Sequence, residues 1–153
     1  MKLYTLLLIV LAGSLTLISC QSDDETCRES TRVTLKIGFY TAGTTKAAPV
    51  DSITVRSLAN DSMYYNNKKN VSNLELALDH STDLLQYAIR FNTQWDTITL
   101  IYSTEPYFVS YACGMVFVHE LDTALTTNHV IKNLQIPEHL ISTANAQHIQ
   151  IYR

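Results

Sequence analysis

The chain has 153 residues, of which 46% are hydrophobic and 16% charged, and its formal net charge is −3. This balance suits one globular domain and excludes a disordered chain. The 11 Lys and Arg residues are scattered, and Lys68-Lys69 is the one adjacent pair. The sequence therefore excludes a strongly basic nucleic-acid-binding protein.

The N-terminus has the pattern of a bacterial secretion signal. Met1-Lys2 is a short basic start, and the apolar run of residues 3–18 is too short to span a bilayer comfortably. Leu17-Ile18-Ser19-Cys20 resembles a lipobox, in which the cysteine thiol takes a diacylglyceryl group. We expect a lipoprotein signal peptide over residues 1–19 and a lipid anchor in a membrane at Cys20. A short membrane helix, or a plain signal peptide with a chance cysteine, is the alternative.

Residues 20–30 are expected to form the lipidated cysteine and a flexible acidic tether. Removal of residues 1–19 would leave 134 residues with a net charge of −4. The run Gln21-Ser22-Asp23-Asp24-Glu25 resembles the surface-export signal of Bacteroidota lipoproteins. The resemblance implies an outer-membrane lipoprotein on the cell surface, and a solvated linker is the alternative.

Residues 31–153 alternate between apolar and polar side chains, which predicts short strands. The expected strands are 32–40, 52–58, 63–65, 74–78, 83–91, 97–103, 107–111, 113–121, 130–136 and 148–153. Residues 92–96 are expected to be a hairpin loop, and short helical turns are expected at most at 79–85 and 138–146. This spacing predicts a single all-β domain, an antiparallel β-sandwich of the immunoglobulin-like, Greek-key type.

The chain contains three cysteines. If Cys20 carries lipid, Cys27 and Cys113 remain, and in an oxidising compartment an even pair predicts a disulfide. Closing a loop of this length could stabilise the fold by about 4 kcal/mol. A reactive thiol at Cys113 and a metal site are the alternatives, although the spacing typical of either is absent.

No pattern in the sequence indicates catalysis. The five histidines, His80, His119, His129, His139 and His148, lack the spacing of metal ligands, and no nucleophile elbow or phosphate-binding glycine loop occurs. We expect a protein that is not an enzyme and has no cofactor and no metal. The alternative is an envelope hydrolase or metal-dependent enzyme whose site forms only in three dimensions, from His119, His129 or His148 with nearby carboxylates.

Two features suggest binding or modification. Trp95 lies in a polar segment, and an exposed indole is a common anchor in interfaces. Four Asp-Ser/Thr-apolar triplets resemble the O-glycosylation sequon of Bacteroidota envelope proteins, although such pairs also start turns for local reasons. The candidate hydroxyls are those of Ser52, Ser62, Thr97 and Thr123.

Three segments together resemble a family of small Bacteroidota lipoproteins known only as a domain of unknown function. They are Cys27-x-Glu29, Asp96 to Tyr102 and Val109-Ser110-Tyr111-Ala112-Cys113-Gly114. The resemblance implies the fold, the envelope location and the Cys27–Cys113 disulfide, but no activity. We expect a lipid-anchored accessory protein that binds an unknown envelope protein or glycan. A subunit that covers a partner's sheet edge is a further alternative.

Overall fold

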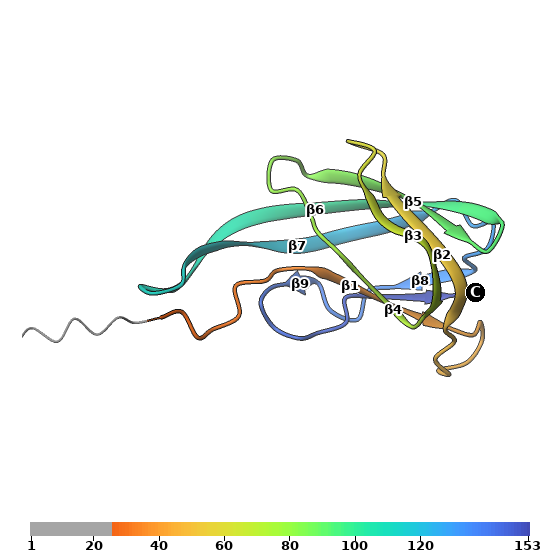
Figure 1. Cartoon of the computed structure of the whole chain (residues 1–153), viewed down its shortest axis with the longest axis horizontal. Helices are drawn as coiled ribbons and strands as arrows, with labels where there is room; N and C mark the ends of the chain where they lie inside the picture. Colours follow the sequence, from red (N-terminus) through yellow and green to blue (C-terminus); the bar gives the residue numbers. More distant parts are fainter. Residues whose placement is uncertain (1–25) are drawn as a thin grey trace, which may run out of the picture.

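The structure, a computed structural model, describes residues 26–153, so the predicted signal peptide and Cys20 lie outside the described residues. Residues 26–153 form ten strands and no α-helix (Figure 1). The strands are β1 (Leu35–Tyr40), β2 (Val50–Ser57), β3 (Met63–Val71), β4 (Asn73–Leu76), β5 (Leu84–Phe91), β6 (Gln94–Ser110), β7 (Gly114–Thr126), β8 (Asn133–Gln135), β9 (Leu140–Ile141) and β10 (Ile149–Tyr152). Within this range, no helix has the length and apolar character needed to cross a membrane.

The strands form two sheets. The smaller sheet has the order β4-β1-β10-β8, and the larger has the order β3-β2-β5-β6-β7-β9. Strands β1 and β10 pair in parallel, whereas every other named pair is antiparallel. The expectation of an all-β fold is therefore confirmed, with the strands divided between two sheets. The parallel pair of β1 and β10 departs from the predicted antiparallel arrangement.

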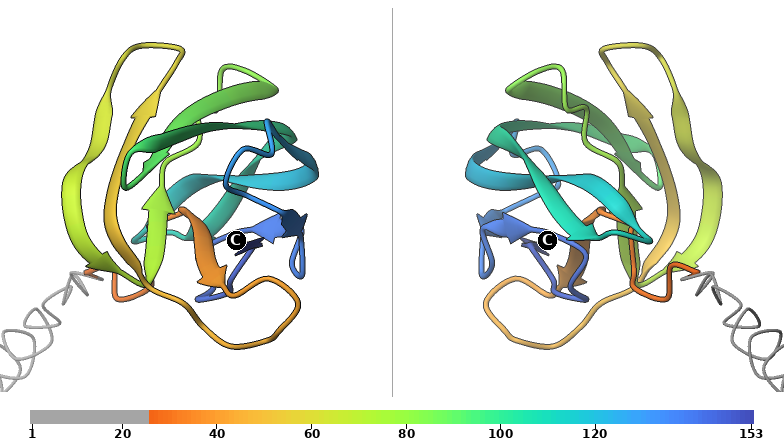
Figure 2. Two further views of the ribbon diagram at one scale, coloured as in Figure 1. Left: turned by 90° about the vertical axis from the view of Figure 1, so that its right-hand side faces the viewer. Right: turned by 90° about the vertical axis from the view of Figure 1, so that its left-hand side faces the viewer.

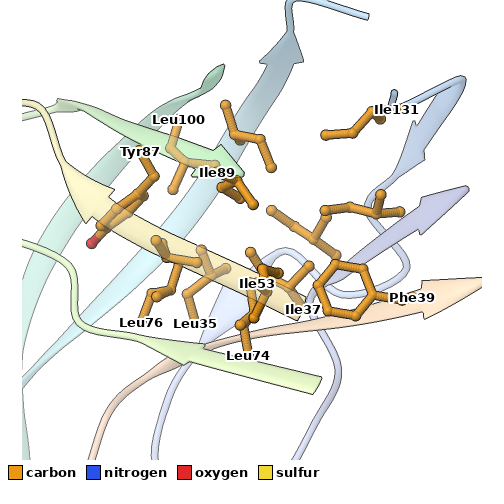
Figure 3. Close-up of a cluster of buried hydrophobic side chains, with 14 of the residues drawn as sticks. Leu35, Ile37, Phe39, Ile53, Leu74, Leu76, Tyr87, Ile89, Leu100 and Ile131 are labelled. Carbon is orange, nitrogen blue, oxygen red and sulfur yellow. The ribbon is translucent and has the colours of Figure 1, made fainter. Parts of the chain in front are cut away.

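The core lies between the two sheets (Figure 3). The inward positions of β1, Leu35, Ile37 and Phe39, are at most 1% exposed. They meet the inward residues of the larger sheet, and the rings of Phe39 and Phe91 contact each other edge to face at 5.8 Å. Because these apolar side chains recur every second residue, β1 turns one face towards the core.

The two expected helical turns are wrong, and the expected hairpin loop is present but shorter than predicted. Residues 79–82 form a turn that leads into β5, and residues 138–146 contain the short strand β9. The loop expected at residues 92–96 is much tighter, because Asn92 has a φ of 54° and β6 already begins at Gln94. Trp95 therefore lies in a strand rather than in a loop.

The two longest strands form a ribbon that projects from the rest of the molecule. Beyond Ile101, β6 has no partner on its β5 side and continues with β7 as an antiparallel hairpin. The sequence predicts two separate strands here, but Pro106 does not interrupt β6, since proline is tolerated at a sheet edge. Figure 1 shows the end of this ribbon beside the start of the described chain, and Figure 2 shows the same ends from two other directions.

Candidate functional site

The predicted disulfide is confirmed. Cys27 and Cys113 are bonded, with their Cα atoms 4.7 Å apart across a sequence separation of 86 residues. The bond links the N-terminal segment to the turn between β6 and β7, and the Cys113 amide in that turn donates to the Ser110 hydroxyl at 3.1 Å. Cys113 is therefore neither a free thiol nor a metal ligand in this structure.

Trp95 is the second residue of β6 and lies on the face of the larger sheet that points away from the core. Its side chain is 42% exposed. Arg90 on β5 is its direct cross-strand partner, and Arg56 comes from β2. The two guanidinium carbons lie 5.5 Å and 5.7 Å from the centre of the indole ring. Three neighbouring strands thus place one aromatic ring and two cations together.

Further hydrogen bonds hold the two arginines in place. Arg90 Nη2 donates to the Thr54 hydroxyl at 2.9 Å, and Arg56 Nη1 lies 3.3 Å from Asp61 Oδ1. Each contact between a cation and the indole ring stabilises this arrangement by about 0.5–1 kcal/mol at an exposed site. The sheet therefore orients both arginines. Arg56 Nε is buried, and guanidinium Nη–H groups at such a surface can donate to carboxylate or phosphate.

The same sheet face carries exposed apolar side chains. Leu84 and Ile101 are cross-strand partners on β5 and β6, and Leu125 is the partner of Thr99 on β7. Their exposed fractions range from 37% to 55%. We call the surface formed by Arg56, Arg90, Trp95, Leu84, Ile101 and Leu125 the Trp95 face. Tryptophan and arginine are enriched where protein interfaces gain most of their binding energy.

Asp96 fixes the strand beneath this face from inside. Its carboxylate accepts hydrogen bonds from the Thr127 hydroxyl at 2.6 Å and from the backbone amides of His129, Val130 and Ile131 at 2.7–2.9 Å. Burial opposes its ionisation, but these hydrogen bonds outweigh burial and lower the pKa of Asp96 to about 2. The sequence predictions missed this role, because the donors come from a loop more than 30 residues away.

The candidate glycosylation residues differ in their accessibility. Ser52 is 8% exposed, and its hydroxyl donates to Asn67 Oδ1 at 2.5 Å. Thr97 and Thr123 are half-buried on β6 and β7, whereas Ser62 is exposed in the turn before β3. Of the four hydroxyls, that of Ser62 is the most accessible to a modifying enzyme.

The histidines do not come together around one centre. His129 lies beside Asp96, His139 Nδ1 bonds to the Leu121 carbonyl, and His148 Nδ1 accepts the Lys36 amide. Burial lowers the pKa of both His119 and His148. Among residues 26–153, no group of three His, Cys, Asp or Glu side chains could hold a metal ion.

His80 and His119 do share a surface groove of about 480 Å³ beside the disulfide. The His80 ring stacks on Phe117 at 4.3 Å, and His119 contacts the Thr104 hydroxyl at 2.8 Å. Besides burial, the electrostatic influence of the neighbouring His80 lowers the pKa of His119. Both imidazoles are thus engaged with neighbouring side chains of the ribbon.

The comparisons with known proteins place the chain in a family. A model of a family of unknown function, DUF6452, matches residues 52–153, which is two thirds of the chain and includes Trp95, Asp96 and Cys113. No curated protein and no solved structure matches. The predicted resemblance to a domain of unknown function is confirmed, whereas the Bacteroidota origin and the lipid anchor remain predictions. The chain therefore belongs to DUF6452, a family of unknown function.

Proposed function

We propose that this protein is a lipid-anchored accessory protein of the cell envelope that binds an envelope protein through the Trp95 face. The observation that carries the proposal is the placement of Trp95 between Arg56 and Arg90 on an exposed sheet face. A flat surface with one indole, two guanidiniums and several aliphatic side chains suits a protein partner with acidic side chains. A glycan partner is the alternative outcome of the test below.

The proposed location rests on the sequence and is compatible with the disulfide. The lipobox-like Leu17-Ile18-Ser19-Cys20 supports a lipid anchor, and the acidic residues 23–25 support export to the outer surface of the outer membrane. Disulfides persist in oxidising compartments such as the bacterial envelope, so the Cys27–Cys113 bond supports the same location.

We also propose that the two sheets form a β-sandwich of the immunoglobulin-like, Greek-key type over residues 31–153. The chain changes sheet six times: between β1 and β2, β3 and β4, β4 and β5, β7 and β8, β8 and β9, and β9 and β10. Such crossings between facing sheets are the connections of Greek-key sandwiches.

Photo-crosslinking in intact cells tests the partner. Gln86 is exposed on the Trp95 face and would be replaced by a photoreactive amino acid. We expect one dominant protein adduct, which is lost in Trp95→Ala and Arg90→Ala but kept in Lys46→Ala, a matched loss of an exposed charge elsewhere. An adduct that survives both substitutions would overturn the role of the Trp95 face, and an adduct with carbohydrate alone would favour the glycan alternative.

Metabolic labelling tests the anchor. The wild-type chain should incorporate a radioactive or clickable fatty acid and fractionate with outer membranes, whereas Cys20→Ala should incorporate none. Intact-cell biotinylation of the wild-type protein then reports whether it faces outward. Equal fatty-acid incorporation in both chains would refute lipidation at Cys20.

A further inference from the structure

The end of the β6–β7 ribbon carries an unusual concentration of exposed apolar side chains. Five of them are 45% to 95% exposed, and Tyr111 in the turn is the most exposed. We call this group the aromatic tip: Tyr107, Phe108, Tyr111, Met115 and Phe117. Residues 106–118 contain no Asp, Glu, Lys or Arg, so the aromatic tip itself carries no charged side chain that would oppose its transfer out of water.

The apolar side chains of the aromatic tip point to both sides of the ribbon. Phe108 and Met115 are cross-strand partners and share one face, while Tyr107 pairs with Val116 on the other. The rings of Phe108 and Tyr111 contact each other edge to face at 5.3 Å, at the very end of the hairpin. A flat protein partner would cover one face only, whereas insertion end-on into a soft apolar medium would cover both.

The disulfide limits the distance between the aromatic tip and Cys20. Cys113 is in the same turn as Tyr111, and it is bonded to Cys27, which is seven residues after Cys20. The chain from Cys20 to Cys27 spans at most about 25 Å when it is fully extended. Because the Cα atom of Cys113 lies 4.7 Å from that of Cys27, a lipid on Cys20 would keep the turn that carries Tyr111 within about 30 Å of the anchor.

We propose that the aromatic tip inserts into the interfacial region of the membrane that holds the lipid anchor, which rests on the lipidation proposed above. Tyr side chains favour this region, where the ring is buried and the hydroxyl stays hydrated. Phe side chains are common on the apolar face of interfacial segments. The depth is limited, because the free edges of a two-stranded ribbon carry backbone groups that cannot enter the hydrocarbon centre. The tip thus acts as a second contact that orients the domain on the bilayer.

Fluorescence quenching in vesicles tests this contact. The lipidated protein, with Trp95→Phe and Tyr111→Trp, is reconstituted into phosphatidylethanolamine–phosphatidylglycerol vesicles that contain lipids brominated near the headgroup or deep in the acyl chain. Shallow bromines should quench the new indole by about half and deep bromines much less, as interfacial insertion requires. The wild-type protein is the matched control, because Trp95 lies at the opposite end of β6 and should not be quenched.

Flotation of the same vesicles distinguishes the proposed membrane contact of the aromatic tip from the proposed lipid anchor. Flotation without quenching would overturn the tip contact and leave the lipid anchor standing. Failure of the wild-type protein to float would overturn both. Lipids with a photoreactive headgroup give a second measurement on the wild-type chain: adducts should map to residues 107–117. Adducts confined to other segments, or Tyr111-dependent dimers in place of lipid adducts, would overturn the proposal.

Discussion

The carboxylate of Asp96 connects the strand that carries Trp95 to the loop that follows β7. It is 1% exposed, and its acceptor positions are used by one hydroxyl and three backbone amides. Such charge-assisted bonds are roughly twice as strong as neutral ones, and an unpaired buried partner is costly. The geometry of the Trp95 face therefore depends on a residue that no ligand would touch.

Asp96→Asn should lower the free energy of unfolding by about 2 kcal/mol at pH 7. The lowered pKa of Asp96, about 2 in place of the usual 3.8, also predicts a pH dependence. Its stabilising contribution is complete above pH 3.8 and is lost as the pH falls towards 2. Urea unfolding between pH 2 and 6 measures both effects, with the exposed Asp122→Asn as control. If the free energy of unfolding changed with pH by the same slope in the wild type and in Asp96→Asn, the prediction would be contradicted.

The ribbon formed by the C-terminal half of β6 and the N-terminal half of β7 depends on a covalent bond to a distant segment of the chain. Past Ile101, the two strands pair almost only with each other, apart from the short contact of His119 and Glu120 with β9. An isolated two-stranded hairpin is at best marginally stable in water. The Cys27–Cys113 bond holds the turn of the ribbon against the N-terminal segment and supplies the missing restraint.

Replacing both Cys27 and Cys113 by serine should therefore loosen the ribbon more than the rest of the fold. We expect the amides of residues 105–118 to become the least protected of any strand, while those of β2 and β5 follow the overall stability. The free energy of unfolding should fall by up to about 4 kcal/mol. Hydrogen exchange of the variant against the oxidised wild type measures this, and unchanged protection in the ribbon would contradict it.

The strands whose sequences alternate could be predicted, and those shaped by distant partners could not. Val33 to Phe39 and Leu85 to Phe91 alternate because one face is buried, which identified β1 and β5. The polar residues 66–70 carry no such signal, yet they continue β3, because the backbone of β2 pairs with them at the sheet edge. Trp95 could be chosen from its sequence context, but its two arginine neighbours could not, since they come from two other strands.

At the scale of the whole molecule, each sheet contains one buried histidine. His119 on β7 belongs to the larger sheet, and His148 joins the smaller sheet through reciprocal bonds with the Lys36 backbone, each at 3.0 Å. Their exposed fractions are 4% and 0%. Burial lowers the pKa of both side chains, so both are neutral in the folded protein at pH 7, while the unfolded chain binds protons near pH 6.5.

Mild acid should therefore weaken both sheets at once. For a histidine whose pKa is lowered by folding, the stabilising contribution is complete above pH 6.5 and declines as the pH falls below that value. Each such histidine contributes a slope of up to about 1.4 kcal/mol per pH unit to the free energy of unfolding.

His119→Asn and His148→Asn keep an acceptor near the position of Nδ1 but do not titrate, so each should flatten the decline in the free energy of unfolding between pH 7 and 5. Urea midpoints across this range measure it, with the exposed His139→Asn as control. A decline of the same slope in the wild type and the double variant would show that acid sensitivity lies elsewhere.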